Sequence, residues 1–139
     1  MKKVDSSCIV ETRERRIKFE ENKRKIIFLN PGAQPYKKVQ VDGCAIQQGL
    51  KCDNLLVSGD ESEERYVELK GKDVMHAVEQ LEATIRELGQ HAGNRHAYII
   101  CTKVLPAYDT RIQGAQKKFR KQYNSALVVK ANQLSVDLG

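Results

Sequence analysis

The sequence predicts an α/β fold: a mixed central β-sheet flanked by helices, with an N-terminal β-hairpin extension. Three observations indicate this fold class. Residues 73–88 carry apolar side chains at helical spacing, residues 97–102 form a nearly continuous apolar run, and short strand-like runs fill residues 36–71. A helix between two strands is typical of a parallel crossover, and strands joined by polar turns are typical of an antiparallel meander. We expect a single domain, because 139 residues is an ordinary domain length, with its core over about residues 36–130.

The first 35 residues are predicted to form a helix and hairpin extension to that core. Ser7 is a suitable N-cap for a short helix from Cys8 to about Arg15. Residues 16–19 then alternate polar and apolar side chains, a turn surrounds Asn22, and residues 25–29 form the return strand. This pattern predicts two antiparallel strands.

Three strands are expected between the extension and the helix: Tyr36 to Ile46, Leu50 to Val57, and Glu64 to Gly71. Asp42-Gly43 interrupts the first strand, as either a tight turn or a bulge. A polar, acidic loop over residues 58–63 leads into the third strand. We expect these strands to form an antiparallel meander, because their connections are short.

The helix over residues 73–88 has signals at both ends. Asp73 is a suitable N-cap and Gly89 a suitable stop, and the apolar stripe between them has a helical period. The run 97–102 that follows is apolar at nearly every position, which is typical of a strand buried on both faces.

The C-terminal part of the chain predicts a second helix and a further strand. Thr110 and Gln113 have the spacing of a capping box, so a helix is expected from Thr110 to about Tyr123. Residues 126–130 are predicted to be a strand, and residues 132–139 are either a tail or a weak edge strand.

Asp53, Glu68 and Lys70 suggest a chemical function. Side chains alternate across a strand, so Glu68 and Lys70 fall on the face opposite Val67 and Leu69. The preceding strand places Asp53 beside them. Two carboxylates are enough to hold a hard cation such as Mg²⁺ or Mn²⁺, and a nearby lysine orients a water or stabilises an anionic transition state. The three residues therefore predict a metal site suited to phosphodiester hydrolysis.

This arrangement resembles the PD-(D/E)xK nuclease superfamily, which has a restriction endonuclease-like or Holliday junction resolvase-like fold. Asp53 matches the first acid of the motif, Glu68 the second acid and Lys70 the lysine. The proline that gives the motif its name is missing, since Cys52 stands before Asp53. The resemblance covers residues 39–123, and it implies a metal-dependent endonuclease that uses Mg²⁺ or Mn²⁺.

The resemblance also implies further site residues. The backbone carbonyl of Leu69 is expected to supply another metal ligand. Gln80 lies on the helix after the lysine strand, where some members of the superfamily have a functional glutamine. Members often carry an additional acid early in the chain, which here is Glu11 if residues 8–15 are helical. Glu20 and Asp42 are the alternatives to Glu11.

The charge distribution favours a nucleic-acid partner. The formal net charge is +6, and basic side chains gather within residues 13–25 and 117–121. Two basic patches on a small domain fit a polyphosphate ligand, and we expect DNA rather than RNA. Cutting both strands of a duplex would call for a homodimer or a larger assembly. The candidate nucleic-acid-binding residues are Arg13, Arg15, Arg16, Lys18, Lys117, Lys118 and Lys121.

A different class of function is also consistent with the sequence. A Glu-x-Lys pair is common on solvated strand faces, so the alternative is a non-catalytic nucleic-acid- or protein-binding module with a degenerate nuclease fold. Neither a G-x-x-x-x-G-K-[S/T] phosphate loop nor a G-x-S-x-G nucleophile elbow is present.

The cysteines and the apolar runs indicate the environment of the protein. No two of the four cysteines have C-x-x-C spacing, so no zinc site is expected. Cys44, Cys52 and Cys101 are predicted to be small buried hydrophobes. No apolar run approaches the roughly 18 residues of a membrane span, and no signal peptide is evident, so a cytoplasmic protein without a membrane partner is expected.

Overall fold

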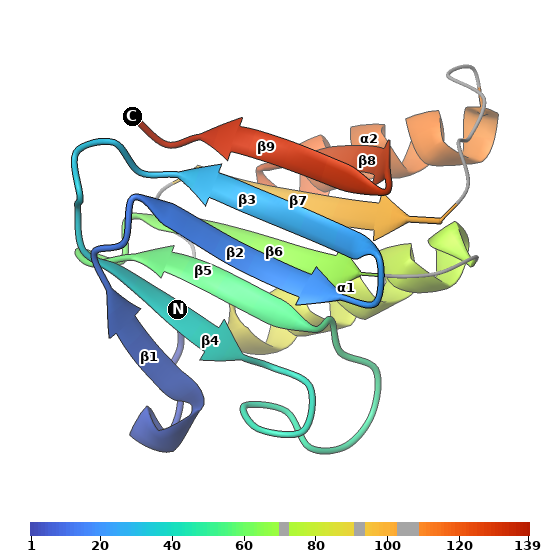
Figure 1. Cartoon of the computed structure of the whole chain (residues 1–139). Coiled ribbons are helices and arrows are strands. Elements are labelled where there is room, and N and C mark those ends of the chain that lie inside the picture. Colours follow the sequence, from blue (N-terminus) through green and yellow to red (C-terminus); the bar gives the residue numbers. More distant parts are fainter. Residues whose placement is uncertain (70–72, 91–93, 103–108) are drawn as a thin grey trace.

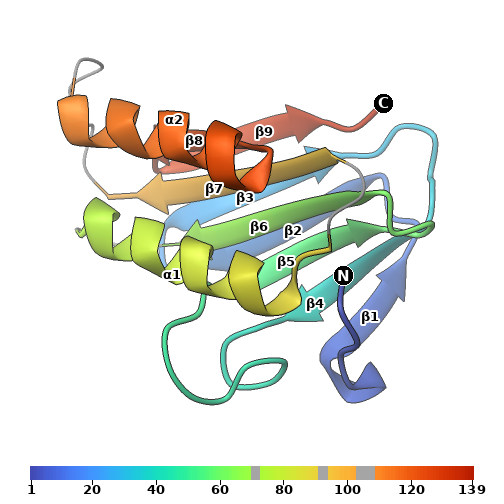
Figure 2. The ribbon, with the colours of Figure 1, turned by 180° about the vertical axis from the view of Figure 1, so that it is seen from behind.

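The molecule is built in three layers. The computed structural model describes residues 1–69, 73–90, 94–102 and 109–139. A six-stranded sheet lies in the middle, two helices cover one of its faces, and a three-stranded sheet covers the other (Figures 1 and 2). The expected α/β class, with a mixed central sheet and helices, is confirmed.

The central sheet has the strand order β1-β4-β5-β6-β7-β8. The first four strands in this order pair antiparallel, and β6, β7 and β8 pair parallel. The predicted meander is therefore confirmed in β4, β5 and β6, and the predicted crossover in β6 and β7. The strands are β1 (Ile9–Thr12), β4 (Tyr36–Gln40), β5 (Asn54–Ser58), β6 (Glu63–Leu69), β7 (Asn94–Cys101) and β8 (Ser125–Ala131).

Both helices bury one apolar stripe against the same face of this sheet. Helix α1 (Val74–Leu88) begins at the predicted cap, where the Asp73 carboxylate accepts a hydrogen bond from the His76 N–H at 2.9 Å. Helix α2 (Thr110–Tyr123) is capped by Asp109 and not by the predicted Thr110 box, because the Asp109 side chain accepts from the first free N–H groups. No helix in the described parts of the chain is long and apolar enough to cross a membrane.

The opposite face is covered by β2 (Arg16–Glu21), β3 (Arg24–Leu29) and β9 (Gln133–Asp137). Strands β2 and β3 pair antiparallel, and β9 pairs parallel with β3. The inward residues of the pair pack on the central sheet, so the two strands form a layer of the core and not an extension. Residues 132–139 are an edge strand of this layer, which settles the alternative left open by the sequence.

The expected helix from Cys8 to Arg15 is wrong. A single 3-10 turn over Ser6–Cys8, capped by Asp5, leads directly into β1. Strand β1 contains Ile9, Val10 and Thr12, whose branched side chains favour extended backbone, and β4 offers it a pairing edge. Long-range pairing thus overrides the local capping signal.

The prediction for Cys44 is also wrong, because a disulfide joins it to Cys8. The bond links the 3-10 turn to the loop that follows β4. Cys52 and Cys101 are buried free thiols, as predicted.

Candidate metal and nucleic-acid site

Asp53 and Glu68 face each other at the end of β6. Asn54 pairs with Val67 in the antiparallel register of β5 and β6, so Asp53, one residue earlier, lies opposite Glu68. Glu68 is only 2% exposed, and its side chain is close enough to lower the pKa of Asp53. The structure therefore brings together the two acids singled out in the sequence.

The surroundings of Asp53 make its negative charge costly. Burial raises the pKa of Asp53, and the charges of Glu21 and Asp42 raise it further. The hydrogen bond from the Leu69 N–H, at 2.8 Å, acts in the opposite direction but does not cancel the rise. Asp53 therefore lies near other acids, and a cation bound beside it would favour its charged form.

Helix α1 holds the segment before Asp53 in place. The Cys52 N–H donates to the Thr84 hydroxyl at 2.8 Å, and the Gln80 side-chain amide donates to the Lys51 carbonyl at 3.0 Å. The buried Oε1 atom of Gln80 has no hydrogen-bond partner within the described residues. Gln80 thus positions the Asp53 backbone and keeps one free acceptor. Burial, together with the neighbouring charges of Glu68 and Asp53, raises the pKa of Cys52 to about 12, so this thiol stays neutral.

Asp42 approaches the pair through the backbone. The Val41 and Asp42 N–H groups both donate to the Asp53 carbonyl, at 3.1 and 3.3 Å. The turn that carries Asp42 is tied to the N-terminal 3-10 turn by the Cys8–Cys44 disulfide. Of the three early acids proposed from the sequence, Asp42 is therefore the one that the fold brings close.

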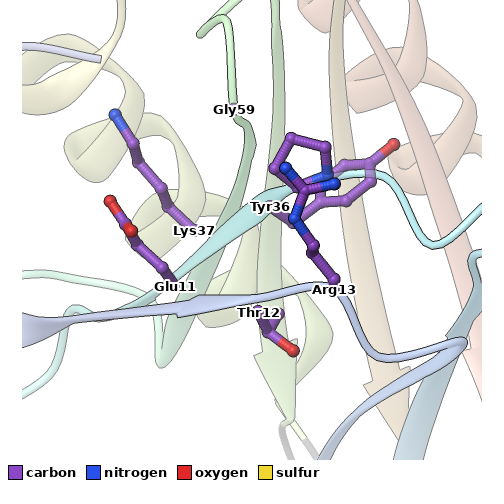
Figure 3. Close-up of a pocket in the computed structure, with 7 residues that line it drawn as sticks. Glu11, Thr12, Arg13, Tyr36, Lys37 and Gly59 are labelled. Carbon is purple, nitrogen blue, oxygen red and sulfur yellow. The ribbon is translucent and has the colours of Figure 1, made fainter.

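Glu11 lies elsewhere. In the strand register it stands in line with Lys37, Val57 and Glu64, four residues back along β6 from Glu68. Four strand residues span about 13 Å. Glu11 borders a separate cavity of about 490 Å³, where its side chain lies beside that of Lys37 (Figure 3). Residues 9–12 form an edge strand instead of the helix on which its proposed role depended, so the fold does not bring Glu11 beside Asp53 and Glu68, and the role stays a prediction.

Glu20, the second alternative for the additional acid, does not face the site, whereas its neighbour Glu21, which the sequence did not single out, acts on Asp53. Glu20 points outward from β2 and forms an ion pair with Lys18 at 3.2 Å. Glu21 continues the inward row of Ile17 and Phe19, and its charge acts on Asp53. Strand alternation assigned these two residues to opposite faces, but the sequence did not indicate which face would meet the central sheet.

The predicted nucleic-acid-binding residues do not form one surface. Residues 13–18 belong to β2 and the segment that leads into it, on one side of the central sheet, and residues 117–121 belong to α2 on the other side (Figures 1 and 2). Lys118 is engaged by Glu82 at 2.9 Å. Lys117 and Lys121 are exposed. Lys70 lies outside the described residues, so its role stays a prediction.

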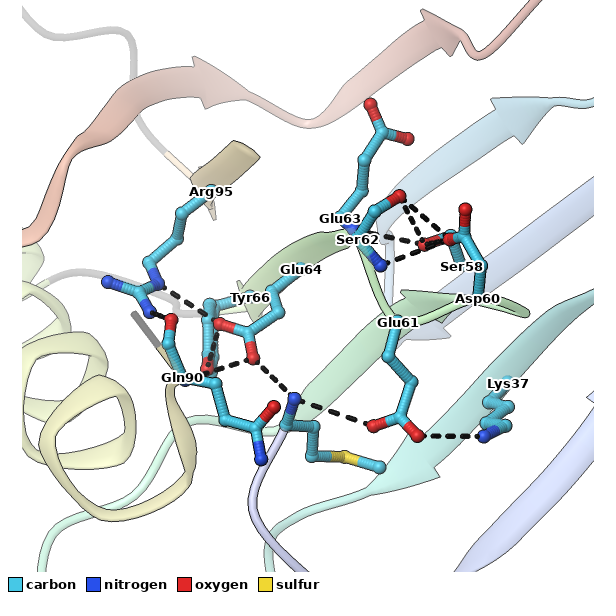
Figure 4. A network of polar contacts seen from close by, with 11 residues as sticks. Lys37, Ser58, Asp60, Glu61, Ser62, Glu63, Glu64, Tyr66, Gln90 and Arg95 are labelled. Atoms are coloured by element: carbon cyan, nitrogen blue, oxygen red, sulfur yellow. Dashed lines mark hydrogen bonds and ion pairs between the residues drawn. The ribbon is translucent and has the colours of Figure 1, made fainter. Parts of the chain in front are cut away.

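A second buried acid, Glu64, serves the fold (Figure 4). Its carboxylate accepts hydrogen bonds from Arg95 at 3.1 Å and from the Tyr66 hydroxyl at 3.0 Å, and it lies 2.8 Å from the Met1 ammonium. Glu61 and Lys37 extend this network at 3.3 Å. Glu64 therefore has its charge balanced by protein cations, in contrast to the acidic surroundings of Asp53.

Comparison with protein-family models, with curated proteins and with solved structures gives no match. Within the described residues there is no group of three or more His, Cys, Asp and Glu side chains placed to hold a metal. The Asp53–Glu68 pair supplies two carboxylates, a number that is enough only for a cation that keeps most of its waters.

Proposed function

We propose that this protein is a metal-dependent endonuclease that hydrolyses phosphodiester bonds, in DNA rather than RNA. The observation that carries the proposal is the facing pair of Asp53 and Glu68 at the carboxyl end of β6. In open α/β sheets, ligands bind outside the carboxyl ends of the parallel strands. The proposal extends to the fold: the central sheet and its helices form a restriction endonuclease-like core.

The donor set fits Mg²⁺ or Mn²⁺. Asp53 and Glu68 would be its protein ligands, the Leu69 backbone carbonyl would be a further one, and water would complete the shell. A bound divalent cation would lower the pKa of a water and neutralise charge on the phosphate. The metal would bind the deprotonated carboxylate, so affinity should fall as pH drops below the raised pKa of Asp53.

The remaining roles follow from the chain's own residues. Lys70 would position the attacking water, a role that rests on its place one residue after Leu69. Gln80 would keep Asp53 in place through Lys51. Exposed basic side chains, including Lys117 and Lys121, would bind phosphates. A homodimer would be needed to cut both strands of a duplex.

Two measurements test this function. Mn²⁺ binding to the protein alone, followed by electron paramagnetic resonance, should be lost in Asp53→Asn and Glu68→Gln. Cleavage of supercoiled DNA with Mg²⁺ or Mn²⁺ should be blocked by EDTA and should fall at least 100-fold in Lys70→Ala, the order expected when a positioned catalytic group is removed. Lys130→Ala, which removes an exposed lysine of β8, should cleave like the wild type.

The alternative, a binding module without catalysis, predicts different results. Such a protein would bind DNA equally well with and without EDTA, would leave the substrate intact, and would be unaffected by Lys70→Ala. Folded wild-type protein that behaves in this way would refute the nuclease proposal.

A further inference from the structure

Arg24 lies at the same end of the molecule as the carboxylate pair. It is the first residue of β3, at the tip of the β2–β3 pair, and its guanidinium donates to the Thr102 hydroxyl at 3.3 Å. Thr102 directly follows β7, whose Ile99 is the register partner of Glu68. Thr102 comes three residues after Ile99, which is about 10 Å along the strand direction. Figure 1 shows this tip beside the ends of β6 and β7.

The strand pleat explains why Arg24 points toward the central sheet. Arg24, Ile26 and Phe28 alternate along β3, and the latter two are buried against that sheet. Arg24 is paired across the tip with Glu21, so both side chains lie on this inward face. The tip thus presents one acid and one base above the carboxyl ends of the parallel strands.

Arg24 is held there without a protein anion. Its Nε atom is buried and has no hydrogen-bond partner in the part of the chain that the structure describes, and no ion pair involves Arg24 among the same residues. Arg65, Arg86, Arg95 and Arg111 each have a carboxylate within 4.0 Å. A buried guanidinium donor without an acceptor is unfavourable unless an anion binds it.

We propose that Arg24 binds a backbone phosphate of the DNA substrate, next to the phosphate that is cut. Its planar fork matches two phosphate oxygens, and Thr102, to which it donates, lies about 10 Å along the strand direction from the register position of Glu68, which favours a neighbouring phosphate over the one that is cut. The inference rests on the proposed nuclease function for the choice of DNA. It adds a substrate contact at the tip of the β2–β3 pair to those proposed for the basic groups 13–18 and 117–121.

The test is fluorescence anisotropy with a fluorescein-labelled DNA duplex in EDTA, which prevents cleavage. Arg24→Gln should weaken binding about 10-fold or more, and it should lower the slope of log affinity against log salt by about 1. Lys23→Gln is the matched control: it removes one charge at the adjacent, exposed turn position and should cause a clearly smaller loss. Arg24→Lys keeps the charge but not the fork, so it should bind with intermediate affinity.

Equal losses in Arg24→Gln and Lys23→Gln, or no loss in Arg24→Gln, would overturn the inference. Circular dichroism in urea verifies the fold of each variant. If Arg24→Gln does not fold, the DNA affinities of Arg24→Lys and Lys23→Arg are compared instead, and only Arg24→Lys should bind more weakly than the wild type.

Mn²⁺ binding, measured without DNA, separates the phosphate contact of Arg24 from the proposed nuclease function. Loss of DNA affinity in Arg24→Gln, in a protein that binds no Mn²⁺, would refute the nuclease and leave the phosphate contact standing. If the protein binds Mn²⁺ but its DNA affinity does not depend on Arg24, the phosphate contact is refuted and the nuclease proposal stands.

Discussion

Two opposing effects act on the pKa of Asp53. Its carboxylate accepts the Leu69 N–H at 2.8 Å, which favours the charged form, but burial and nearby acids favour the protonated form and prevail. Among the described residues Asp53 has no cation within 4.0 Å, whereas Glu64 has Arg95. An acid kept at a cost in stability is typical of functional sites.

Asp53→Asn should therefore make the protein more stable at pH 7. The folded protein binds the Asp53 proton more tightly than the unfolded chain does, since its pKa is raised above 3.8. The unfolding free energy thus falls as pH rises from about 4 through the raised pKa. The asparagine can still accept the hydrogen bond from the Leu69 N–H. Urea midpoints should be higher for the variant at pH 7, and the difference should shrink near pH 4.

Asp60→Asn is the control with the opposite sign. Hydrogen bonds from Ser62 and Ser58 lower the pKa of Asp60 to about 2, so its charge stabilises the fold above pH 3.8 and the contribution is lost as pH falls toward 2. This variant should be less stable at pH 7. A destabilised Asp53→Asn protein would contradict our description of the Asp53 environment.

At the scale of elements, one acid joins the two helices. Glu82 of α1 is 8% exposed and accepts hydrogen bonds from Lys118 and Tyr123 of α2, both at 2.9 Å. Burial alone would raise the pKa of Glu82, but these partners outweigh it and the pKa is lowered. Glu82 thus holds the helical layer together, and through α1 it supports the anchoring of Lys51 and Cys52.

Glu82→Ala should lower the unfolding free energy by about 1–3 kcal/mol, because it leaves two donors without their acceptor. The contribution should be present above pH 4.5 and lost as pH falls through the lowered pKa of Glu82. Denaturant titration across pH measures both effects. Glu79→Ala, on the exposed side of the same helix, should change stability by less than about 0.5 kcal/mol. Equal effects of the two substitutions would show that the bridge contributes nothing.

At the scale of the whole molecule, the central sheet has a separate core on each face. Helices α1 and α2 cover one core, and β2, β3 and β9 cover the other. The candidate site lies where the three layers end together. The Cys8–Cys44 disulfide ties the N-terminal turn to the loop beside Asp53, so it closes this end of the molecule covalently.

Reducing this disulfide should destabilise the whole fold. The two cysteines are 36 residues apart, and a loop of that length corresponds to roughly 4 kcal/mol at most. The urea midpoint should fall in reductant for the wild type but not for Cys44→Ser, which is already without the bond. Four free thiols in the unreduced, unfolded protein would contradict the assignment.

Much of the fold could be predicted because its signals are local. The stripe over residues 73–88, the apolar run at 97–102 and the meander of short strands each reflect a periodicity within one element. The meeting of Asp53 and Glu68 also follows from local information, since a short connection between two strands makes antiparallel pairing and a facing register the simplest arrangement. The third member of the motif, Lys70, stays a prediction.

Apart from the wrongly expected helix at residues 8–15 and the alternatives left open at 132–139, the sequence by itself determined the order of helices and strands and the two facing acids, because backbone pleat and helical period assign each side chain to a face. The tertiary structure alone decided which faces meet. It moved Glu11 to a distant edge, brought the tip that carries Glu21 and Arg24 to the same end of the sheet as Asp53, and paired Cys8 with Cys44. Contacts between layers depend on packing among residues far apart in the chain, and no periodicity within one segment encodes them.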